Sequence, residues 1–204
     1  MLEIPFPNKK YQIIYADPPW RFEKGFWDRS KSNPTSHYDT MSIPDICALP
    51  IGTISADNSH LYMWTTSRHL MDGDAVKVIK SWGFTPMNII TWCKPQISLG
   101  YYFRNSTEHL LFAKKGKLHT LDRVQGTYKV SDRLKHSQKP QYFRDTIVRC
   151  SGNLSRIELF ARQRTPGWDV WGNEVDMIKE EQMQTRIEFT EPAVKSEQGE
   201  MFKE

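Results

Sequence analysis

The chain has 204 residues, enough for one substantial hydrophobic core, and 38% of them are hydrophobic, as is usual in globular proteins. No apolar run approaches the roughly 20 residues that a membrane-spanning helix needs, which excludes an integral membrane protein. Three widely spaced cysteines, Cys47, Cys93 and Cys150, exclude a disulfide framework and a zinc-binding repeat, and residues 1–10 lack a signal-peptide core. We therefore expect a cytoplasmic protein that does not associate with membranes.

Short apolar segments alternate with amphipathic ones along the chain, a pattern typical of a parallel α/β sheet. The sequence predicts strands at 11–16, 60–65, 87–92, 108–113 and 156–160, and helices at 42–49, 68–82 and 140–150. Ser42 suits a helix N-cap with Pro44 in the first turn, and Gly83 suits a helix end. Polar loops are predicted at 21–41, where a mobile segment can close over a substrate, and at 114–136.

Charge is distributed unevenly along the chain. The net charge is +4, but the residues from Asp176 onward hold more acidic than basic side chains, so the preceding part is more basic than the sum indicates. A moderately basic core suits contact with phosphates, although ordinary solvated lysine and arginine faces give the same balance. Few apolar anchors occur near the end of the chain. We predict a folded domain at 1–178 and an acidic, disordered tail at 179–204.

The tetrapeptide Asp17-Pro18-Pro19-Trp20 directly follows the first predicted strand. Ligands of open α/β sheets bind outside the carboxyl ends of the strands, so Asp17 is expected to face a site. The two prolines make the turn rigid and remove backbone donors, which leaves Asp17 and the Pro18 carbonyl as acceptors beside the plane of Trp20. A stiff connection with no further role is the alternative, because Asp and Pro are common turn residues.

Two fixed acceptors beside an aromatic plane suit the exocyclic amine of a nucleobase. Each acceptor can take one amine hydrogen while the tryptophan stacks on the base. These hydrogen bonds favour a pyramidal nitrogen and stabilise the positive charge that develops when the amine attacks a methyl sulfonium. The pattern predicts amino-group methylation without a metal or a covalent intermediate, with Asp17, Pro18, Pro19 and Trp20 as the catalytic residues.

Seven further blocks follow the tetrapeptide in a consistent order. They are Ser36-His37-Tyr38-Asp39-Thr40-Met41, His60-Leu61-Tyr62-Met63-Trp64-Thr65-Thr66, Ile89-Ile90-Thr91-Trp92-Cys93-Lys94, Tyr102-Phe103-Arg104-Asn105-Ser106-Thr107-Glu108-His109, His136-Ser137-Gln138-Lys139-Pro140, Arg156-Ile157-Glu158-Leu159-Phe160-Ala161-Arg162 and Gly167-Trp168-Asp169-Val170-Trp171-Gly172-Asn173-Glu174-Val175. With these blocks, the chain from about residue 11 to 175 resembles the family of the 70-kDa subunit of mRNA adenosine methyltransferase, in a compact form similar to its bacterial and phage members.

The resemblance implies a Rossmann-like α/β fold that uses S-adenosylmethionine, in a circularly permuted order. The candidate cofactor strand 156–160 comes late, after the acceptor motif, so the active site should join the two ends of the domain. The implied reaction is methylation of the exocyclic 6-amino group of adenine in nucleic acid. DNA is the preferred substrate because compact relatives look like bacterial or phage DNA modifiers, and a second copy or a related subunit is an expected partner.

The later blocks are expected to hold S-adenosylmethionine. Lys139 would pair with the methionine carboxylate or orient the acceptor, and Ser137 has a capping position beside the helix start at Pro140. Asn173 and Glu174 suit the adenosine hydroxyls and the ring edge. Each has an ordinary alternative when taken singly, such as a solvated arginine or a core phenylalanine. The implied cofactor-binding residues are Asp17, Ser137, Lys139, Phe160, Arg162, Arg164, Asn173 and Glu174.

Substrate contacts are expected from a second group of residues. Tyr38 can stack on a flipped base, Arg104 can hold a phosphate, and Glu108 can accept from a base edge. The implied substrate-binding residues are Trp20, Tyr38, Lys94, Arg104, Asn105 and Glu108. The histidines lack the close spacing of metal ligands, so no metal site is predicted.

Two features depart from expectation. The segment from Phe160 to Gln163 lacks the glycine-rich turn of many nucleotide-binding units, and the short segment 1–10 cannot supply the extra strand with which some larger relatives contact the cofactor adenine. Three alternatives stay open: an RNA adenine methyltransferase, a catalytically silent nucleic-acid-binding subunit, and methylation of the cytosine amine. Silent members tend to lose the acidic and aromatic ends of the tetrapeptide, and both are present here.

Overall fold

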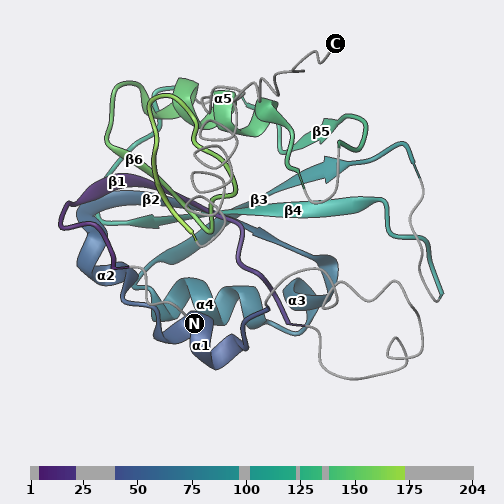
Figure 1. The fold of residues 1–204 in the computed structure, drawn as a ribbon. Helices are drawn as coiled ribbons and strands as arrows, with labels where there is room; N and C mark the ends of the chain where they lie inside the picture. Colours follow the sequence, from purple (N-terminus) through teal and green to yellow (C-terminus); the bar gives the residue numbers. More distant parts are fainter. Residues whose placement is uncertain (1–4, 22–39, 97–101, 123–124, 135–137, 173–204) are drawn as a thin grey trace, which may run out of the picture.

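The computed structural model describes residues 5–21, 40–96, 102–122, 125–134 and 138–172. Within these residues the strands form one seven-stranded sheet in the order β5-β3-β4-β2-β1-β6-β7, with helices on both faces (Figure 1). The strands are β1 (Tyr11–Ala16), β2 (Ser55–Thr65), β3 (Thr85–Cys93), β4 (Thr107–Lys115), β5 (Tyr128–Val130), β6 (Arg156–Leu159) and β7 (Asp169–Trp171). The helices are α1 (Ile43–Ala48), α2 (Ile51–Ile54), α3 (Ser67–Met71), α4 (Asp74–Ser81) and α5 (Gln141–Ser151). The predicted α/β class is confirmed.

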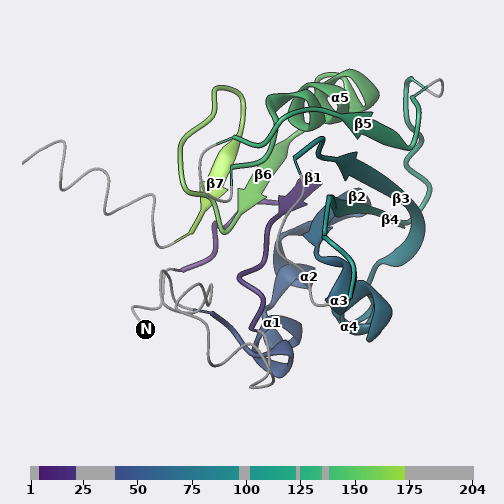
Figure 2. The same ribbon diagram turned by 90° about the vertical axis from the view of Figure 1, so that its right-hand side faces the viewer.

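Strand directions differ from the predicted all-parallel sheet at one position. Strand β4 runs antiparallel to both of its neighbours, β2 and β3, whereas the other neighbouring pairs are parallel. The connection from β3 to β4 includes no helix in its described residues, and without a crossover helix the chain turns back as a hairpin. The start of β4 therefore lies at the same edge as the carboxyl ends of the other strands (Figure 2).

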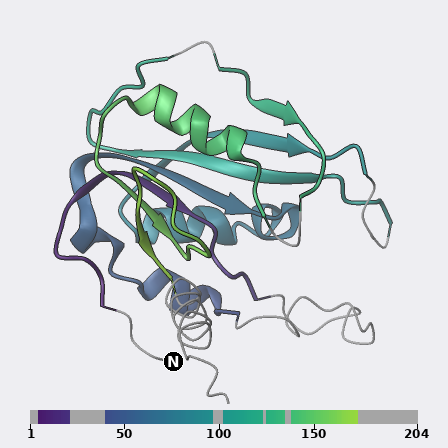
Figure 3. The same ribbon diagram turned by 45° about the horizontal axis from the view of Figure 1, so that its top comes forward.

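Each face of the sheet has its own hydrophobic core. Helices α1 and α4 cover one face, where Ile14 packs with Ile46 and Val78, and α5 crosses the other, where Tyr15 packs with Phe143 (Figures 1 and 3). Because both faces of β1 are covered, its side chains are almost all buried, which explains the continuous apolar run in the sequence.

Helix boundaries follow the local signals closely, with one correction. The Asp45 amide donates to Ser42 Oγ (3.3 Å), so Ser42 caps α1 as predicted, and Gly83 adopts the left-handed conformation (φ 85°) after α4. The predicted single helix at 68–82 is wrong: Gly73, with φ 79°, separates α3 from α4. Glycine reaches this conformation without steric cost and so ends one helix before the next begins.

Strand boundaries required more correction. The region 114–136, predicted as a loop, contains β5, which pairs with β3 at the sheet edge, and β7 was not predicted. Both strands have three residues, too few to show a periodic pattern. Strand β2 begins earlier than predicted, at Ser55, and β6 ends at Leu159 because Phe160 turns into the left-handed region (φ 58°).

The first and the late strand of the domain lie side by side. Strand β1 pairs in parallel with β6, with Ile13 opposite Arg156 and Ala16 opposite Leu159. This pairing brings Asp17 and Phe160, which follow the two strands, to the same edge. The relation to other methyltransferases by circular permutation stays a prediction, and the predicted tail at 179–204 lies outside the described residues. Among the helices of the described part, none is long and apolar enough to cross a membrane.

Candidate active site

Four predicted site residues, each from a different part of the chain, meet at the carboxyl edge of the sheet. Asp17 follows β1, Lys94 follows β3, and Glu108 lies at the start of the antiparallel β4. Lys139 precedes α5 and reaches the same place. We call Asp17, Lys94, Glu108 and Lys139 the edge network.

The edge network alternates acidic and basic groups. Lys139 Nζ donates to Asp17 Oδ2 (2.7 Å) and lies 3.4 Å from Glu108 Oε2, and Lys94 Nζ donates to Glu108 Oε1. The Lys139 and Lys94 side chains are about nine-tenths buried, whereas those of Asp17 and Glu108 are each 26% exposed. The carboxylates therefore present accessible acceptor oxygens above a layer of fixed ammonium groups.

Neighbouring charges favour the ionised forms of Glu108 and Lys139. Burial by itself raises the pKa of Glu108, but the ammonium groups of Lys139 and Lys94 outweigh it, and the pKa lies below its ordinary value. Burial likewise lowers the pKa of Lys139, but the carboxylates of Asp17 and Glu108 outweigh it and raise the pKa above its ordinary value. The charges of Glu108 and Lys139 are thus maintained by their neighbours.

Backbone hydrogen bonds hold the Asp17–Trp20 turn, and its rigidity stays a prediction from the two prolines. The Trp20 amide donates to the Pro18 carbonyl (2.9 Å) and the Met41 amide donates to the Pro19 carbonyl (2.8 Å), so both proline carbonyls already accept one hydrogen bond. The Arg21 amide donates in turn to the Met41 carbonyl (3.2 Å). A carbonyl oxygen has two lone pairs, so the Pro18 carbonyl retains the capacity to accept a second donor.

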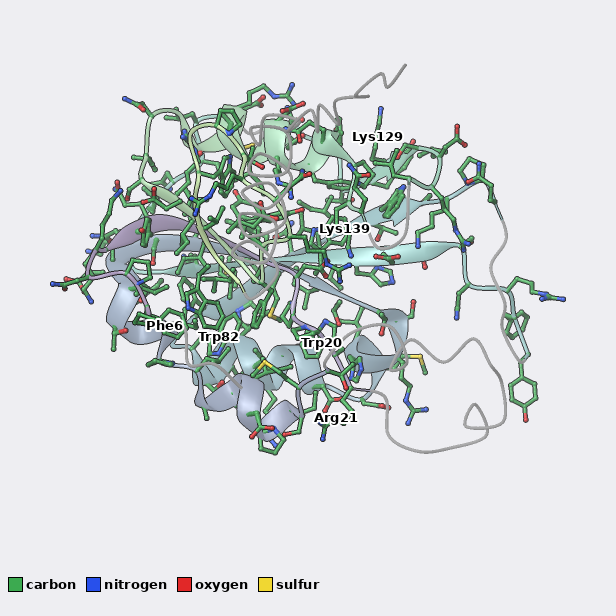
Figure 4. The ribbon with its side chains drawn as sticks, viewed as in Figure 1. Phe6, Trp20, Arg21, Trp82, Lys129 and Lys139 are labelled. Atoms are coloured by element: carbon green, nitrogen blue, oxygen red, sulfur yellow. The ribbon has the colours of Figure 1, made fainter. Side chains whose placement is uncertain are left out.

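Trp20 occupies a different position from the one expected for a base-stacking plane. Its side chain is 7% exposed, its Nε1 donates to the Trp64 carbonyl (3.0 Å), and its ring stacks on His69 with centroids 5.0 Å apart. His69 Nδ1 lies 2.8 Å from Asp74 Oδ2, a geometry in which the ring nitrogen donates to the carboxylate. Figure 4 shows Trp20 on the side of the sheet that α4 covers. Trp20 therefore anchors the turn to the core, and its stacking on a base stays a prediction.

A second charged group lies beneath the edge network, between β6 and α5. Arg144 donates to both oxygens of Glu158, at 3.0 and 2.5 Å, and both side chains are 8% exposed. The Arg144 guanidinium lies 5.3 Å from the Tyr15 ring centroid, and Trp64 Nε1 donates to the Tyr15 hydroxyl (2.6 Å). The Lys139 ammonium in turn lies 5.3 Å from the Trp64 ring. The buried pair Arg144–Glu158 thus supports the floor of the site.

Burial dominates the ionisation of Glu158 and Tyr15 in this lower layer. It raises the pKa of Glu158 above its ordinary value, since the Arg144 guanidinium offsets only part of the desolvation and the charge of Asp17 adds to it. Burial also raises the pKa of the Tyr15 hydroxyl far above its usual range. Tyr15 is therefore a neutral hydroxyl below the site and not a base.

A strained turn at the end of β6 replaces the missing glycine-rich loop. Phe160 has φ 58°, which non-glycine residues rarely adopt, and the Ala161 amide donates to the Trp171 carbonyl (3.0 Å). Gly172 lies so close that an added Cβ would stand 2.6 Å from the backbone of Ala161. The turn is therefore pressed against the end of β7, beside the carboxyl end of β1.

The residues at this edge fit a cationic, nucleoside-like cofactor. Asp17, a carboxylate, and the strained turn at Phe160 follow neighbouring residues of two paired strands. A carboxylate attracts a sulfonium, and strained backbone of this kind is concentrated at ligand sites. Beyond the turn, Arg162 is half-buried and Arg164 is exposed.

The remaining predicted residues lie outside the edge network. Arg104 and Asn105 are exposed and lie shortly before β4, three to four residues ahead of Glu108. The N-cap residue of α5 is Pro140 and not Ser137. Four predicted site residues lie outside the described residues: Tyr38, Ser137, Asn173 and Glu174.

Sequence reasoning missed the residues that support the site from within. Glu158 interrupts the buried strand β6, and Arg144 lies on the buried face of α5 between Phe143 and Ile147. A charged residue at a position that the periodic pattern assigns to the core was the available signal. His69 and Asp74 gave no comparable signal, because their mutual contact lies across the break at Gly73 and the stacking of His69 on Trp20 joins distant parts of the chain.

Among the described residues, no group of three or more histidine, cysteine, aspartate or glutamate side chains is arranged to hold a metal ion.

The sheet order, the acidic turn after β1 and the strained turn after β6 agree with a Rossmann-like domain of the S-adenosylmethionine-dependent methyltransferase class. A family model described as MT-A70 matches residues 11–174. The chain belongs to the MT-A70 family and is an adenine-specific methyltransferase.

Curated relatives of the chain include bacterial and eukaryotic proteins. The chain is 34% identical over 187 residues to the type II methyltransferase M.MunI of a Mycoplasma species, covering 83% of this chain and 79% of that one. It is 28% identical to the N6-methyladenosine RNA methyltransferase MTA1 of Cryphonectria parasitica, covering 81% of this chain and 52% of that one. It is 27% identical to the human N(6)-adenine-specific methyltransferase METTL4, covering 82% of this chain and 38% of that one. The chain thus spans about half or less of these two eukaryotic relatives.

Proposed function

We propose that this protein transfers a methyl group from S-adenosylmethionine to the exocyclic 6-amino group of adenine in nucleic acid, with DNA as the preferred polymer. The observation that carries the proposal is the edge network, in which Lys139 holds the Asp17 carboxylate at the carboxyl edge of the sheet (2.7 Å). Family membership supports the adenine amine over the cytosine amine as the acceptor.

S-adenosylmethionine, when bound, supplies an electrophilic methyl group on a positively charged sulfur. Asp17 and the turn at Phe160 would hold it, together with Arg162 and Arg164. Ser137, Asn173 and Glu174 are further proposed contacts, carried over from the family resemblance. Lys139 is already paired with Asp17, so we assign it to orienting that carboxylate, with the methionine carboxylate as a competing partner.

The chain activates the adenine amine by accepting its hydrogens. Lys139 donates to one oxygen of Asp17, and the second carboxylate oxygen can accept from the amine, as can the remaining lone pair of the Pro18 carbonyl. As the nitrogen–carbon bond forms and the sulfur–carbon bond breaks, these acceptors stabilise the positive charge on the nitrogen. The proton then leaves the nitrogen for Asp17 or for water.

Glu108 and Lys94 are proposed to recognise the base edge. The Glu108 carboxylate is accessible and fixed by two ammonium groups, so it can accept a hydrogen bond without reorganising. Arg104, Asn105 and Tyr38 would contact the surrounding nucleotides. A second copy or a related subunit is a further proposed partner, and a cytoplasmic location stays a prediction.

Two observations bear on the choice of polymer. M.MunI, a type II methyltransferase, matches over 79% of its length, which supports DNA. The relative MTA1 is named an RNA methyltransferase, which keeps RNA as the second candidate. A silent binding subunit is disfavoured, because both Asp17 and Trp20 are present and the carboxylate lies at the open edge of the sheet.

The test is transfer of a labelled methyl group to matched DNA and RNA, each single-stranded and duplex, with the product nucleoside identified by mass spectrometry. Formation of 6-methyladenine by the wild type and its loss in Asp17→Ala are expected, with Asp72→Asn, in an exposed ion pair, as the matched control. Equal transfer by the wild type and Asp17→Ala would overturn the assigned role. Nucleic-acid binding without transfer would favour the silent subunit.

A further inference from the structure

Two adjacent aromatic side chains are almost fully exposed near the active edge. Tyr102 and Phe103 are each 88% exposed, far more than large aromatic side chains usually are in folded proteins. Neither belongs to the two hydrophobic cores of the sheet. Contiguous exposed apolar surface of this kind often marks an interaction site.

The pair lies between β3 and β4, and the described residues 102–106 that carry it project beyond the carboxyl edge of the sheet (Figure 1). At its root the Lys94 amide donates to the Ser106 carbonyl (2.7 Å), and Glu108 of the edge network follows directly. Since extended chain rises by about 3.3 Å per residue, Tyr102 lies within roughly 20 Å of Glu108 along the backbone. The pair thus lies within reach of nucleotides that flank a base bound at the edge network.

Basic side chains accompany the aromatic pair. Arg104 follows it directly and is exposed, and Arg133 is also exposed on the segment after β5. The Arg133 amide donates to Gln96 Oε1 (3.3 Å), which holds that segment against the root of the β3–β4 connection. The nearby Asp132 already accepts from Gln96 Nε2 (2.6 Å). The surface therefore combines exposed aromatic faces with guanidinium groups.

We propose that Tyr102 and Phe103 form a stacking platform for unpaired nucleotides next to the target adenine, with Arg104 and Arg133 contacting the adjacent phosphates. The inference rests on the proposed function, of which it specifies the substrate as single-stranded. Aromatic stacking combined with positive charge is the usual means of single-strand binding. In a duplex both faces of each base are covered by neighbouring bases, so only an unpaired base can stack on these side chains.

Binding experiments test the platform without requiring catalysis. A fluorescent single-stranded oligonucleotide and its duplex are titrated with the wild type, the double variant Tyr102→Ala/Phe103→Ala, and the control Tyr128→Ala, which removes a 67% exposed aromatic on β5. Stacking contributes about 1–3 kcal/mol per base, so the double variant should bind the single strand at least about tenfold more weakly. The duplex affinity of the double variant and the affinities of the control Tyr128→Ala should stay within about twofold of the wild-type values, a difference of about 0.4 kcal/mol. Tyr102→Trp/Phe103→Trp should retain single-strand binding.

Equal losses for single strand and duplex, or no loss for either, would overturn the platform. A second copy of this chain is the other possible occupant of the aromatic pair, and sedimentation of the same variants tests it. A switch from dimer to monomer with unchanged single-strand affinity would show that the pair docks a second copy. Methyl transfer separates this inference from the proposed function. For the wild type, methyl transfer to a long single strand is compared with transfer to a trinucleotide, which is too short to reach the platform. In the double variant this ratio should fall at least about tenfold, because the stacking energy that favours the long strand is lost. If the wild type transfers to no acceptor, the proposed function fails, and the binding titration still decides on the platform.

Discussion

The edge network and the buried pair Arg144–Glu158 are built from the same kinds of charges but respond differently to their surroundings. Glu108 has two ammonium partners and a side chain that is 26% exposed, and its pKa is lowered. Glu158 has one guanidinium partner and a side chain that is 8% exposed, and its pKa is raised, chiefly by burial. An ion pair at the edge of the sheet thus stays charged and accessible, whereas a pair in the core is maintained against a desolvation cost.

This difference assigns the two groups different roles. We propose that the carboxylates of the edge network exchange a partner for a substrate group, because their side chains are each 26% exposed. Arg144 and Glu158 have no such freedom, and their contacts with Tyr15 hold the strand that leads to Asp17. We therefore expect substitutions in the core pair to reduce stability and substitutions in the edge network to reduce activity.

The largest expected effect is on stability and comes from Arg144→Met. Removing the guanidinium leaves the Glu158 carboxylate buried without its bidentate partner, which should lower the free energy of unfolding by about 3–5 kcal/mol. Urea denaturation followed by circular dichroism measures it. The double variant Arg144→Met/Glu158→Leu should recover most of the loss.

The matched substitution in the edge network is Lys139→Met. It should lower the free energy of unfolding by only about 1–2 kcal/mol, which lies between the values for exposed and buried charged hydrogen bonds. Equal losses at the two sites would contradict the comparison.

Asp17→Asn should give the largest loss of activity. The side chain keeps its shape but loses the charge that stabilises the developing cation, so kcat should fall by about 10²–10³-fold, or roughly 3–4 kcal/mol of activation free energy. The free energy of unfolding should change by less than about 1 kcal/mol, since Asp17 is partly exposed. Methyl transfer and urea denaturation on one preparation provide both values. A stability loss as large as that of Arg144→Met would assign Asp17 a structural role.

His69→Ala should have an intermediate effect, because His69 contacts the Asp17–Trp20 turn through the Trp20 ring. Losing the stack should let the turn shift and lower kcat about tenfold, while the KM values for both substrates stay within about twofold, since small misplacements act on rate. His69→Phe keeps a ring plane and should retain most of the activity. Asp72→Asn, at the C-cap of the same helix α3, is the control. Parallel rises of KM would show instead that the substrate site has collapsed.

The smallest expected effect is a difference in pH dependence. The pKa of Glu108 is lower in the folded protein than its ordinary value of 4.5, so the stabilisation by its charged form is complete above that pH and lost as the pH falls through the lowered pKa. At pH 7, Glu108→Gln should cost about 1 kcal/mol, a difference that shrinks in acid.

Glu158 should show the opposite sign. Its pKa is raised, so protonation in acid favours the folded state, and the wild type should gain stability relative to Glu158→Gln as the pH falls. Urea denaturation at pH 7 and near pH 4 measures both differences. If the stability differences of Glu108→Gln and Glu158→Gln from the wild type changed with pH in the same direction, the contrast between the edge network and the buried pair would be wrong.

Much of the site was predictable because its signals are local. The Asp17–Trp20 turn, the Ser42 cap and the helix end at Gly83 depend on residues that are neighbours in sequence, and the structure has each of them. The family blocks also predicted Lys94, Glu108 and Lys139 as site residues, and the structure brings them together with Asp17, although their membership of an active site stays a proposal. The division of the predicted helix at Gly73 and the short strands β5 and β7 were missed, since a three-residue strand exists only through its pairing.

The sequence by itself determined the α/β class, the strand that leads to Asp17 and the rigid acceptor turn, because apolar periodicity and proline geometry act over a few residues. Only the tertiary structure decided that Lys139 reaches Asp17 across more than a hundred residues, that Trp20 packs on His69, and that Arg144 neutralises Glu158 beneath the site. These contacts join residues from different elements. Their energies come from burial and pairing, which depend on the order and direction of the strands.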